Sequence, residues 1–269
     1  MTPTAAPQCL IDPTRSSQHF YGGDPHDVPM PMDYFVWAAF SDEHTVVVES
    51  GFNAEVAARR GREYLRCPTE GLQQLGIDCA RVSCVVLTHL HYDHVGNLEK
   101  FPEATFVVQE EEMAFWTGRY AGREHFRHTV EVEDVIHLIR ENFKGRLHFV
   151  DGCEEIVPGI EVYRAGGHSA GLQVVRVKKE KGYVVLASDA THFYANLEED
   201  RPFSIVHDLS RMHSAFDLVR SLADSPAHMV PGHDPQVMQR FPVARKGLDR
   251  RGLPHRLRMT AALAGYHVS

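Results

Sequence analysis

The chain has 269 residues, of which 43% are hydrophobic and 24% charged, and 36 acidic against 28 basic side chains give it a net charge of -8. This composition is typical of globular proteins and argues against a disordered, collagenous or fibrous chain. The acidic balance argues against a nucleic-acid partner, because a nucleic-acid-binding face is normally basic. The longest uncharged apolar stretch, 34–40, is far shorter than the roughly 20 residues that cross a bilayer, so we expect no membrane partner.

The N-terminal segment and the cysteines both bear on the cellular compartment. Residues 1–13 contain neither the basic n-region nor the apolar h-region of a secretory signal. The five cysteines form no CxxC pair and leave one odd thiol, which favours reduced thiols over a disulfide framework. We therefore expect a cytoplasmic protein.

Predicted elements follow in chain order. Residues 1–33 are rich in proline, glycine and polar side chains and predict an N-terminal arm or surface loop. Apolar, β-branched runs predict strands at 34–40 and 45–50, joined as a hairpin, and then at 82–88, 104–108, 147–150, 160–165, 172–178, 183–188 and 227–230. Helices are expected at 53–65, 69–75, 109–117, 130–142 and 211–223, followed by a polar helical or irregular tail over 243–263.

Strands and helices alternate in both halves of the chain, and we find no short-period repeat and no low-complexity linker. Such alternation predicts one α/β domain with two layers of sheet inside and helices outside. We assign this single domain to residues 34–269.

Histidine is unusually abundant, with 18 residues, and four metal-ligand side chains fall within the six-residue segment HLHYDH, 89–94. At strand spacing, His89 and His91 point to the same side, whereas Asp93 and His94 fall on the turn that follows, where the chain can wrap around an ion. Three imidazoles and a carboxylate suit zinc, manganese, iron or cobalt rather than calcium or magnesium. The segment therefore predicts a metal site directly after a buried strand.

The HxHxDH spacing resembles the signature of the metallo-β-lactamase superfamily, and three later segments resemble its other metal-binding elements. His168 lies in GGHSAG (166–171), Asp189 follows the strand 183–188, and His233 lies in PGHDP (231–235) after the strand 227–230. The resemblance covers approximately residues 34–240. It implies an αββα sandwich with the site at one edge, between the sheets.

This resemblance implies two divalent metal ions per chain, with zinc expected first and manganese, iron or cobalt as alternatives. One ion would be bound by His89, His91 and His168. The other would be bound by Asp93, His94 and His233. Asp189 would bridge the two.

Within the superfamily, the chain is most similar to the N-acyl homoserine lactone lactonases that act in quorum quenching. The segments on which this similarity rests are VPMP (28–31), HSAGLQ (168–173), Asp189-Ala190 and PGHDP. The resemblance implies a hydrolase that opens a small-molecule lactone by attack of a metal-bridging hydroxide, with Asp93 passing a proton to the leaving oxygen. It also implies a homodimer.

Two departures from the lactonase pattern concern the site. The usual DTG after the second strand is Glu49-Ser50-Gly51 here, and Glu49 is a candidate acceptor for a hydrogen bond from a metal ligand. The lactonase tyrosine three residues after the bridging aspartate is replaced by His192, while Tyr194 lies two residues further on. Either His192 or Tyr194 could donate to the substrate carbonyl oxygen.

A glyoxalase II-like thioester hydrolase is the alternative, because that group shares HxHxDH and usually has a basic C-terminal segment. The tail of this chain carries six basic residues, Arg245, Lys246, Arg250, Arg251, Arg256 and Arg258. The VPMP and PGHDP elements favour the lactonase.

Overall fold

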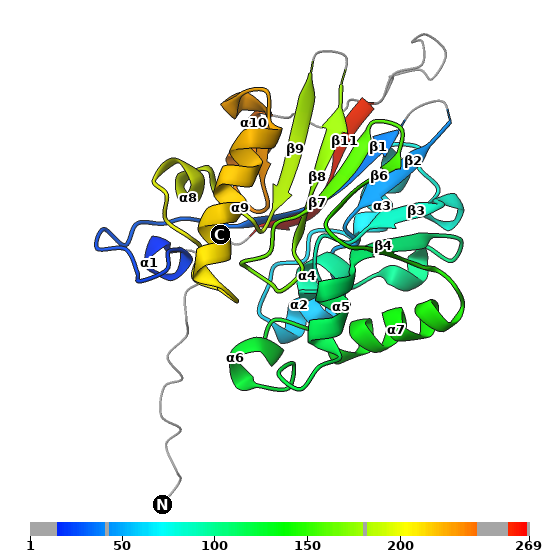
Figure 1. Cartoon of the computed structure of the whole chain (residues 1–269), viewed down its shortest axis with the longest axis horizontal. Helices are drawn as coiled ribbons and strands as arrows, with labels where there is room; N and C mark the ends of the chain where they lie inside the picture. Colours follow the sequence, from blue (N-terminus) through cyan, green and yellow to red (C-terminus); the bar gives the residue numbers. More distant parts are fainter. Residues whose placement is uncertain (1–14, 41–42, 180–181, 241–257, 268–269) are drawn as a thin grey trace, which may run out of the picture.

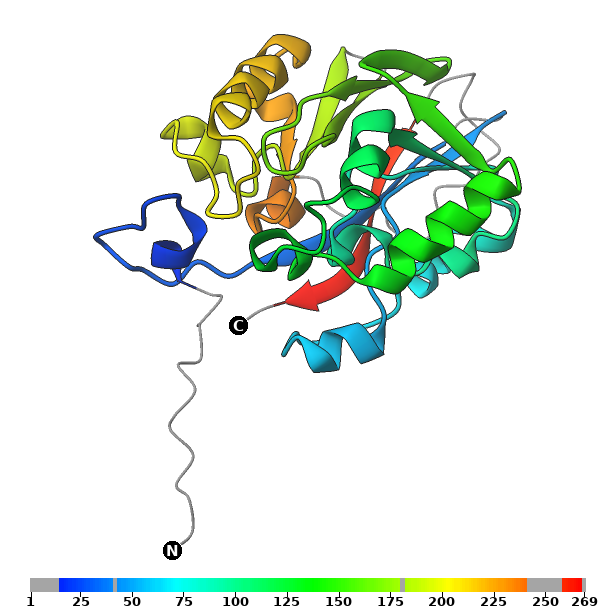
Figure 2. The same cartoon turned by 60° about the horizontal axis from the view of Figure 1, so that its bottom comes forward.

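Two β-sheets lie face to face in the computed structural model of the chain, which describes residues 15–40, 43–179, 182–240 and 258–267 (Figure 1). The strand order is β11-β1-β2-β3-β4-β5 in the first sheet and β10-β9-β8-β7-β6 in the second. Helices cover the outer faces of both sheets, as the two views in Figures 1 and 2 show. The fold is the αββα sandwich that the sequence predicted.

The first sheet contains β1 (Asp33–Phe40), β2 (Thr45–Val48), β3 (Cys84–Val86), β4 (Thr105–Gln109), β5 (Leu147–Val150) and β11 (Arg258–His267). Strands β2 to β5 are parallel, whereas β1 is antiparallel to both β2 and β11. The second sheet contains β6 (Cys153–Val157), β7 (Ile160–Arg164), β8 (Gln173–Lys178), β9 (Tyr183–Ser188) and β10 (Met229–Pro231). Strands β6 to β9 are antiparallel, and β10 joins β9 in parallel.

The helices in the described part of the chain are α1 (Ser16–His19), α2 (Ala54–Arg59), α3 (Pro68–Gln74), α4 (Tyr92–Val95), α5 (Glu110–Trp116), α6 (Glu124–Arg127), α7 (Val132–Phe143), α8 (Tyr194–Glu198), α9 (Leu209–Leu222) and α10 (Gln236–Arg240). Short 3-10 turns occur at Cys79–Arg81, Leu98–Lys100 and Pro226–His228. None of the described helices is both long and apolar enough to cross a membrane.

Alternation along the strands explains why both faces of each sheet are buried. In β2, Val46 and Val48 belong to the core between the sheets, whereas Val47 packs with the helices on the other face. In β8, Val175 faces the first sheet and Val174 packs on the outer side, in the same cluster as α9. Successive strand side chains point to opposite faces, so these apolar runs specify strands that are covered on both sides.

Most of the expected strands and helices are present, and the hairpin of β1 and β2 is confirmed. The tail is different. Residues 258–263, expected to be helical or irregular, belong to β11 and pair with β1, which satisfies backbone groups that β1 would otherwise expose at the sheet edge. The rest of the expected tail, 243–257, lies outside the described residues. Strand β6 was not predicted, because it is a largely exposed edge strand of sequence CEEIV.

The N-terminal segment 15–32 packs against the loop that follows α8. The Tyr21 N–H donates to the Pro202 carbonyl at 2.8 Å, and the Ser204 hydroxyl donates to the Gln18 carbonyl at 2.5 Å. His19 and Phe20 are buried. This segment therefore contributes to the interior of the molecule next to the site described below.

Candidate metal centre

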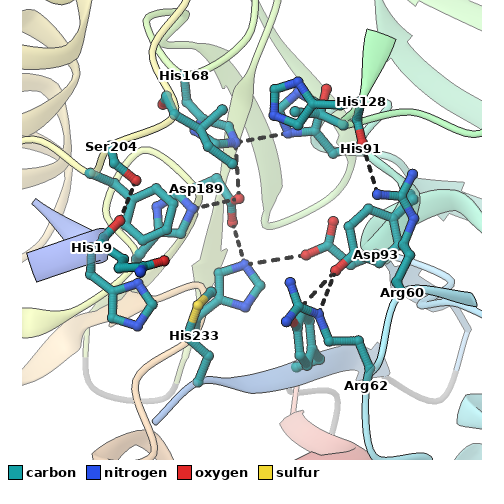
Figure 3. Close-up of a pocket in the computed structure, with 18 residues that line it drawn as sticks. His19, Arg60, Arg62, His91, Asp93, His128, His168, Asp189, Ser204 and His233 are labelled. Atoms are coloured by element: carbon teal, nitrogen blue, oxygen red, sulfur yellow. Dashed lines mark hydrogen bonds and ion pairs between the residues drawn. The ribbon is translucent and has the colours of Figure 1, made fainter. Parts of the chain in front are cut away.

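Four segments bring metal-ligand side chains to the same edge of the sandwich. The segment HLHYDH follows β3, the loop containing His168 follows β7, Asp189 follows β9 and His233 follows β10. Strands β7, β9 and β10 run in the same direction within their sheet, so their carboxyl ends meet at one edge. Figure 3 shows His91, Asp93, His168, Asp189 and His233 converging there.

The first group of donors consists of His89, His91, His168 and Asp189, whose ligand atoms all lie within 4.8 Å of one another. The His168 Nε2 atom is 2.9 Å from His91 Nδ1 and 3.1 Å from Asp189 Oδ2. Asp189 Oδ2 is also 3.6 Å from His89 Nε2. All four residues are buried.

The second group consists of Asp93, His94 and His233. The Nε2 atoms of His94 and His233 lie 3.5 Å and 2.9 Å from Asp189 Oδ1. They lie 3.6 Å and 3.7 Å from Asp93 Oδ2. Asp189 therefore turns one carboxylate oxygen toward each group, which is the arrangement that a bridging ligand requires. All seven side chains named from the sequence are brought together.

The donor set fits divalent metal ions. The Nε2 atoms of His89, His94 and His233 are buried and have no hydrogen-bond partner outside the donor set. Unpaired buried polar atoms are costly, and here each lies within 3.6 Å of a carboxylate oxygen of Asp189. Imidazole nitrogens with carboxylate oxygens are the donors that zinc, manganese, iron and cobalt accept.

The electrostatic environment keeps His89 and His91 in the neutral form that coordinates a metal ion. Burial, together with neighbouring imidazoles, holds the pKa values of His89 and His91 well below the ordinary value, so both rings are neutral and have a free lone pair. Burial also lowers the pKa of His94, but the carboxylates of Glu49, Asp93 and Asp189 outweigh it and raise that pKa well above its usual value. A cation bound at the second group would take the place of that proton.

Backbone and side-chain acceptors orient the imidazoles from outside. His168 Nδ1 lies 2.9 Å from the Ile205 carbonyl, and His233 Nδ1 lies 2.8 Å from the Asp33 carbonyl. If these Nδ1 atoms carry the protons, each Nε2 atom is left as a donor to metal. Such outer contacts set the tautomer and ring orientation of metal-binding histidines.

Glu49 supplies the matching contact for His94, since its Oε1 atom lies 3.2 Å from His94 Nδ1. The same carboxylate accepts a hydrogen bond from the Thr88 hydroxyl and another from Ser188 Oγ at 3.3 Å. Glu49 is buried and has a positive φ of 71°, a conformation that is costly for a residue with a side chain. The longer glutamate thus reaches an imidazole of the site and joins the ends of β3 and β9.

Glu112 is a supporting residue that the sequence did not reveal. Its fully buried carboxylate accepts hydrogen bonds from Leu90 N at 3.0 Å, Ser169 Oγ at 2.8 Å and Gly171 N at 2.7 Å. It also accepts one from the Trp116 indole at 2.8 Å. The carboxylate therefore ties the loop of His89 and His91 to the loop of His168. No local pattern distinguishes it from its neighbours Glu110 and Glu111.

A cavity of about 310 Å³ opens onto the metal-ligand cluster. His192 is one of its lining residues; its Nε2 atom lies 3.0 Å from Asp189 Oδ2, and its ring stacks on Phe203 at 3.5 Å. Tyr194 does not line this cavity. It packs in the core between the sheets, under the guanidinium of Arg240, and its buried hydroxyl has no hydrogen-bond partner. Of the two candidate donors, only His192 reaches the cavity.

The basic tail lies outside the residues whose side chains the structure describes.

Residues 30–233 match the family model described as the metallo-beta-lactamase superfamily. The N-acyl homoserine lactonase AiiB of Agrobacterium fabrum is 29% identical over 209 residues, which cover 71% of this chain and 75% of that relative. An N-acyl homoserine lactonase of a Bacillus species is 24% identical over 216 residues, which cover 74% of this chain and 78% of that relative.

Solved structures show the same fold. An N-acyl homoserine lactone hydrolase with the product N-hexanoyl-L-homoserine bound at its catalytic metal centre gives a TM-score of 0.65 at 19% identity, covering 84% of this chain and 93% of its own. The dizinc quorum-quenching lactonase AidC gives a TM-score of 0.60 at 18% identity, covering 76% of this chain and 73% of its own.

Proposed function

The chain belongs to the metallo-β-lactamase superfamily, and we propose that it is a metal-dependent hydrolase that opens the ring of small-molecule lactones, as its relatives named N-acyl homoserine lactonases do. One observation carries the proposal above all others. Seven buried or nearly buried donors converge at one edge of the sandwich, and five of them line a cavity that is large enough for a small organic ligand.

The metal part of the proposal is a pair of divalent ions, with zinc expected and manganese, iron or cobalt as alternatives. His89, His91 and His168 would hold one ion; Asp93, His94 and His233 would hold the other, with Asp189 shared. When bound, two such ions supply a water activated for attack and a Lewis acid for the carbonyl oxygen. The relative AidC, described as a dizinc lactonase, supports this number.

The protein residues would move the proton. Addition of water to the lactone carbonyl releases a proton, and cleavage of the ring C–O bond creates an alkoxide that needs one. Asp93 lines the cavity with a side chain that is 10% exposed, so its carboxylate can take the first proton and deliver it to the departing ring oxygen. His192, also in the cavity wall, would position the carbonyl end of the substrate.

Three further expectations belong to this proposal. The hydrolase domain spans 34–269, and two chains associate as a homodimer. The enzyme works in the cytoplasm, in keeping with the free thiols of Cys67, Cys79, Cys84 and Cys153.

A hydrolysis panel tests the proposal. Metal-loaded protein would be assayed against N-acyl homoserine lactones of different chain length, simple γ- and δ-lactones, lactones from aromatic-ring cleavage, and S-lactoylglutathione. We expect hydrolysis of lactones that is lost when the metals are removed and restored when they are added back. Faster hydrolysis of S-lactoylglutathione than of any lactone would make the protein a thioesterase. No turnover by protein that holds two metals would refute the hydrolase.

A further inference from the structure

One cation in the cavity wall lacks a counter-ion. Arg60 and Arg62 both line the cavity, on the side away from His19 and Ser204 (Figure 3). Arg60 is neutralised, because its guanidinium lies 2.7 Å from a carboxylate oxygen of Glu131 and donates to the His128 carbonyl at 2.8 Å. Arg62 forms no ion pair with any carboxylate among the described residues. Among the described residues, the one hydrogen bond of the Arg62 side chain runs from Nε to the Tyr92 hydroxyl, at 3.2 Å.

The backbone holds Arg62 in place. Helix α2 ends in a Schellman motif, in which Gly61 N donates to the Ala58 carbonyl at 3.3 Å and Arg62 N donates to the Ala57 carbonyl at 2.8 Å. Gly61 has the positive φ of 64° that this turn requires. The backbone of Arg62 is therefore fixed at the end of helix α2.

The side chain is anchored by the metal-binding motif itself. Tyr92, which accepts from Arg62, stands between His91 and Asp93, and its hydroxyl lies 3.4 Å from that of Tyr34. The guanidinium is thereby held in a set position relative to two of the expected metal ligands. Since Nε makes this contact, both Nη groups remain available for another partner.

The unpaired charge of Arg62 favours the binding of an anion. An arginine stays protonated at any physiological pH, and a half-buried charge without a partner is unfavourable. Asp93 is the carboxylate that interacts electrostatically with the Arg62 guanidinium. Asp93, however, is expected to bind metal. A guanidinium with two free Nη groups binds a carboxylate through two parallel hydrogen bonds.

We propose that Arg62 binds a carboxylate of the substrate, so that the preferred lactones carry a free carboxylate close to the ring and not a long neutral acyl chain. This inference rests on the proposed lactone hydrolysis. The cavity volume of about 310 Å³ lies at the small end of ligand pockets, which suits a compact ring with a short anionic substituent. Arg62 is a specificity-determining residue in this scheme and takes no part in bond cleavage.

A matched substrate pair tests the proposal. The anionic lactone 5-oxotetrahydrofuran-2-carboxylate would be compared with its neutral carboxamide. We expect the wild-type protein to favour the carboxylate in kcat/KM by about 10- to 100-fold, the usual contribution of charge-assisted hydrogen bonds. Arg62→Gln should abolish this preference, because it should lower kcat/KM for the carboxylate about 10- to 100-fold more than kcat/KM for the carboxamide. The control Arg66→Gln alters an arginine that contacts Gln74 and does not line the cavity, and should keep the preference.

A binding measurement separates this proposal from the hydrolase itself. The ketone 3-oxocyclopentane-1-carboxylate has no ring oxygen and cannot be hydrolysed, so calorimetry can compare it with its carboxamide in wild type and Arg62→Gln. Tighter binding of the acid that depends on Arg62, without turnover of any lactone, would uphold the anion site and refute the hydrolase. Equal hydrolysis of both lactones and equal binding of both ketones would overturn the anion site and leave the hydrolase standing. An equal loss for acid and amide in Arg62→Gln would also overturn it.

Discussion

Asp93 is assigned two tasks, binding a metal and carrying a proton, and one substitution can separate them. Asp93→Asn keeps the size and one oxygen but removes the charge and the exchangeable proton. We expect turnover to fall by about 10²–10⁴-fold, the usual range for general acid–base catalysis. The loss should shrink for lactones with better leaving groups, because a more stable alkoxide or enolate needs less protonation.

Metal content has to be measured in the same samples, since lost metal would imitate lost acid catalysis. Asp217→Asn is the control, because Asp217 is 83% exposed and pairs with Arg220 on the surface. Near-normal turnover of a poor-leaving-group lactone by an Asn variant that keeps both metals would rule out the proton transfer.

Gly232 lies so close to Asp189 that no side chain fits between them. A Cβ atom at this position would be 2.6 Å from Asp189 Oδ1 and 2.9 Å from the Ser188 carbonyl oxygen. Gly232→Ala should therefore displace the Asp189 carboxylate and weaken metal binding about 10- to 100-fold, as outer-contact changes at metal sites do. Elemental analysis after dialysis measures this loss. Gly122→Ala, where a Cβ meets nothing within 4 Å, should retain its metal; equal metal retention by both variants would contradict the prediction.

At the scale of elements, helix α5 connects two loops of the site through Glu112. Glu112→Ala removes the acceptor for two backbone N–H groups, an indole and a hydroxyl, all buried. We expect the free energy of unfolding to fall by about 3–5 kcal/mol, because several buried donors lose their acceptor at about 1–3 kcal/mol each. Denaturant titration measures it. Glu110→Ala, exposed on the same helix, should change stability by less than about 0.5 kcal/mol. If Glu112→Ala lowers the free energy of unfolding by less than about 1 kcal/mol, the contacts of Glu112 do not contribute appreciably to stability.

Helix α7 carries an acid with an unusual pKa in its first turn. Burial, reinforced by the charges of Glu131 and Glu99, raises the pKa of Asp134 to about 7. The folded state thus keeps a proton that the unfolded state releases above about pH 4, so stability falls as the pH rises from about 4 to 7 and stays reduced above that.

Asp134→Asn removes this dependence. The variant should gain about 1 kcal/mol at pH 8 relative to wild type, after allowance for partial exposure to water, and show a smaller gain at pH 5. Thermal unfolding at the two pH values measures the difference. Glu133→Gln, an exposed neighbour on the same helix, is the control. A gain that does not grow with pH would mean that Asp134 is ionised throughout.

At the scale of the whole molecule, metal ions would join segments from both sheets. The donors follow β3 in the first sheet and β7, β9 and β10 in the second. Ligands that bind only the folded state stabilise it by about 4 kcal/mol at a thousand times their Kd. We therefore expect two metal equivalents per chain, and a large fall in Tm when a chelator removes them.

His89→Ala should lower both the metal content and the Tm. His125→Ala, a residue outside the donor groups, should leave both unchanged. Protein that is active, resistant to chelators and reproducibly free of metal would overturn the metal centre.

Local patterns in the sequence were sufficient for much of the architecture. The apolar run before His89 predicts a buried strand, and the spacing of HLHYDH predicts donors at its end. Both follow from the periodicity of an extended chain, which depends only on neighbouring residues. The later donors His168, Asp189 and His233 were found by resemblance to known elements, and the structure brings them next to the first four.

What only the tertiary structure decided are relations between segments far apart in the chain. Strand β11 pairs with β1 across more than 200 residues, and a polar edge strand such as β6 has no apolar alternation to reveal it. Glu112 differs from its neighbours Glu110 and Glu111 because the loops of Leu90 and Gly171 donate hydrogen bonds to it. Arg62 likewise becomes distinct from Arg60 only when Glu131 neutralises one and not the other. Local sequence specifies which groups a segment carries, whereas burial and pairing depend on which distant segments pack against it.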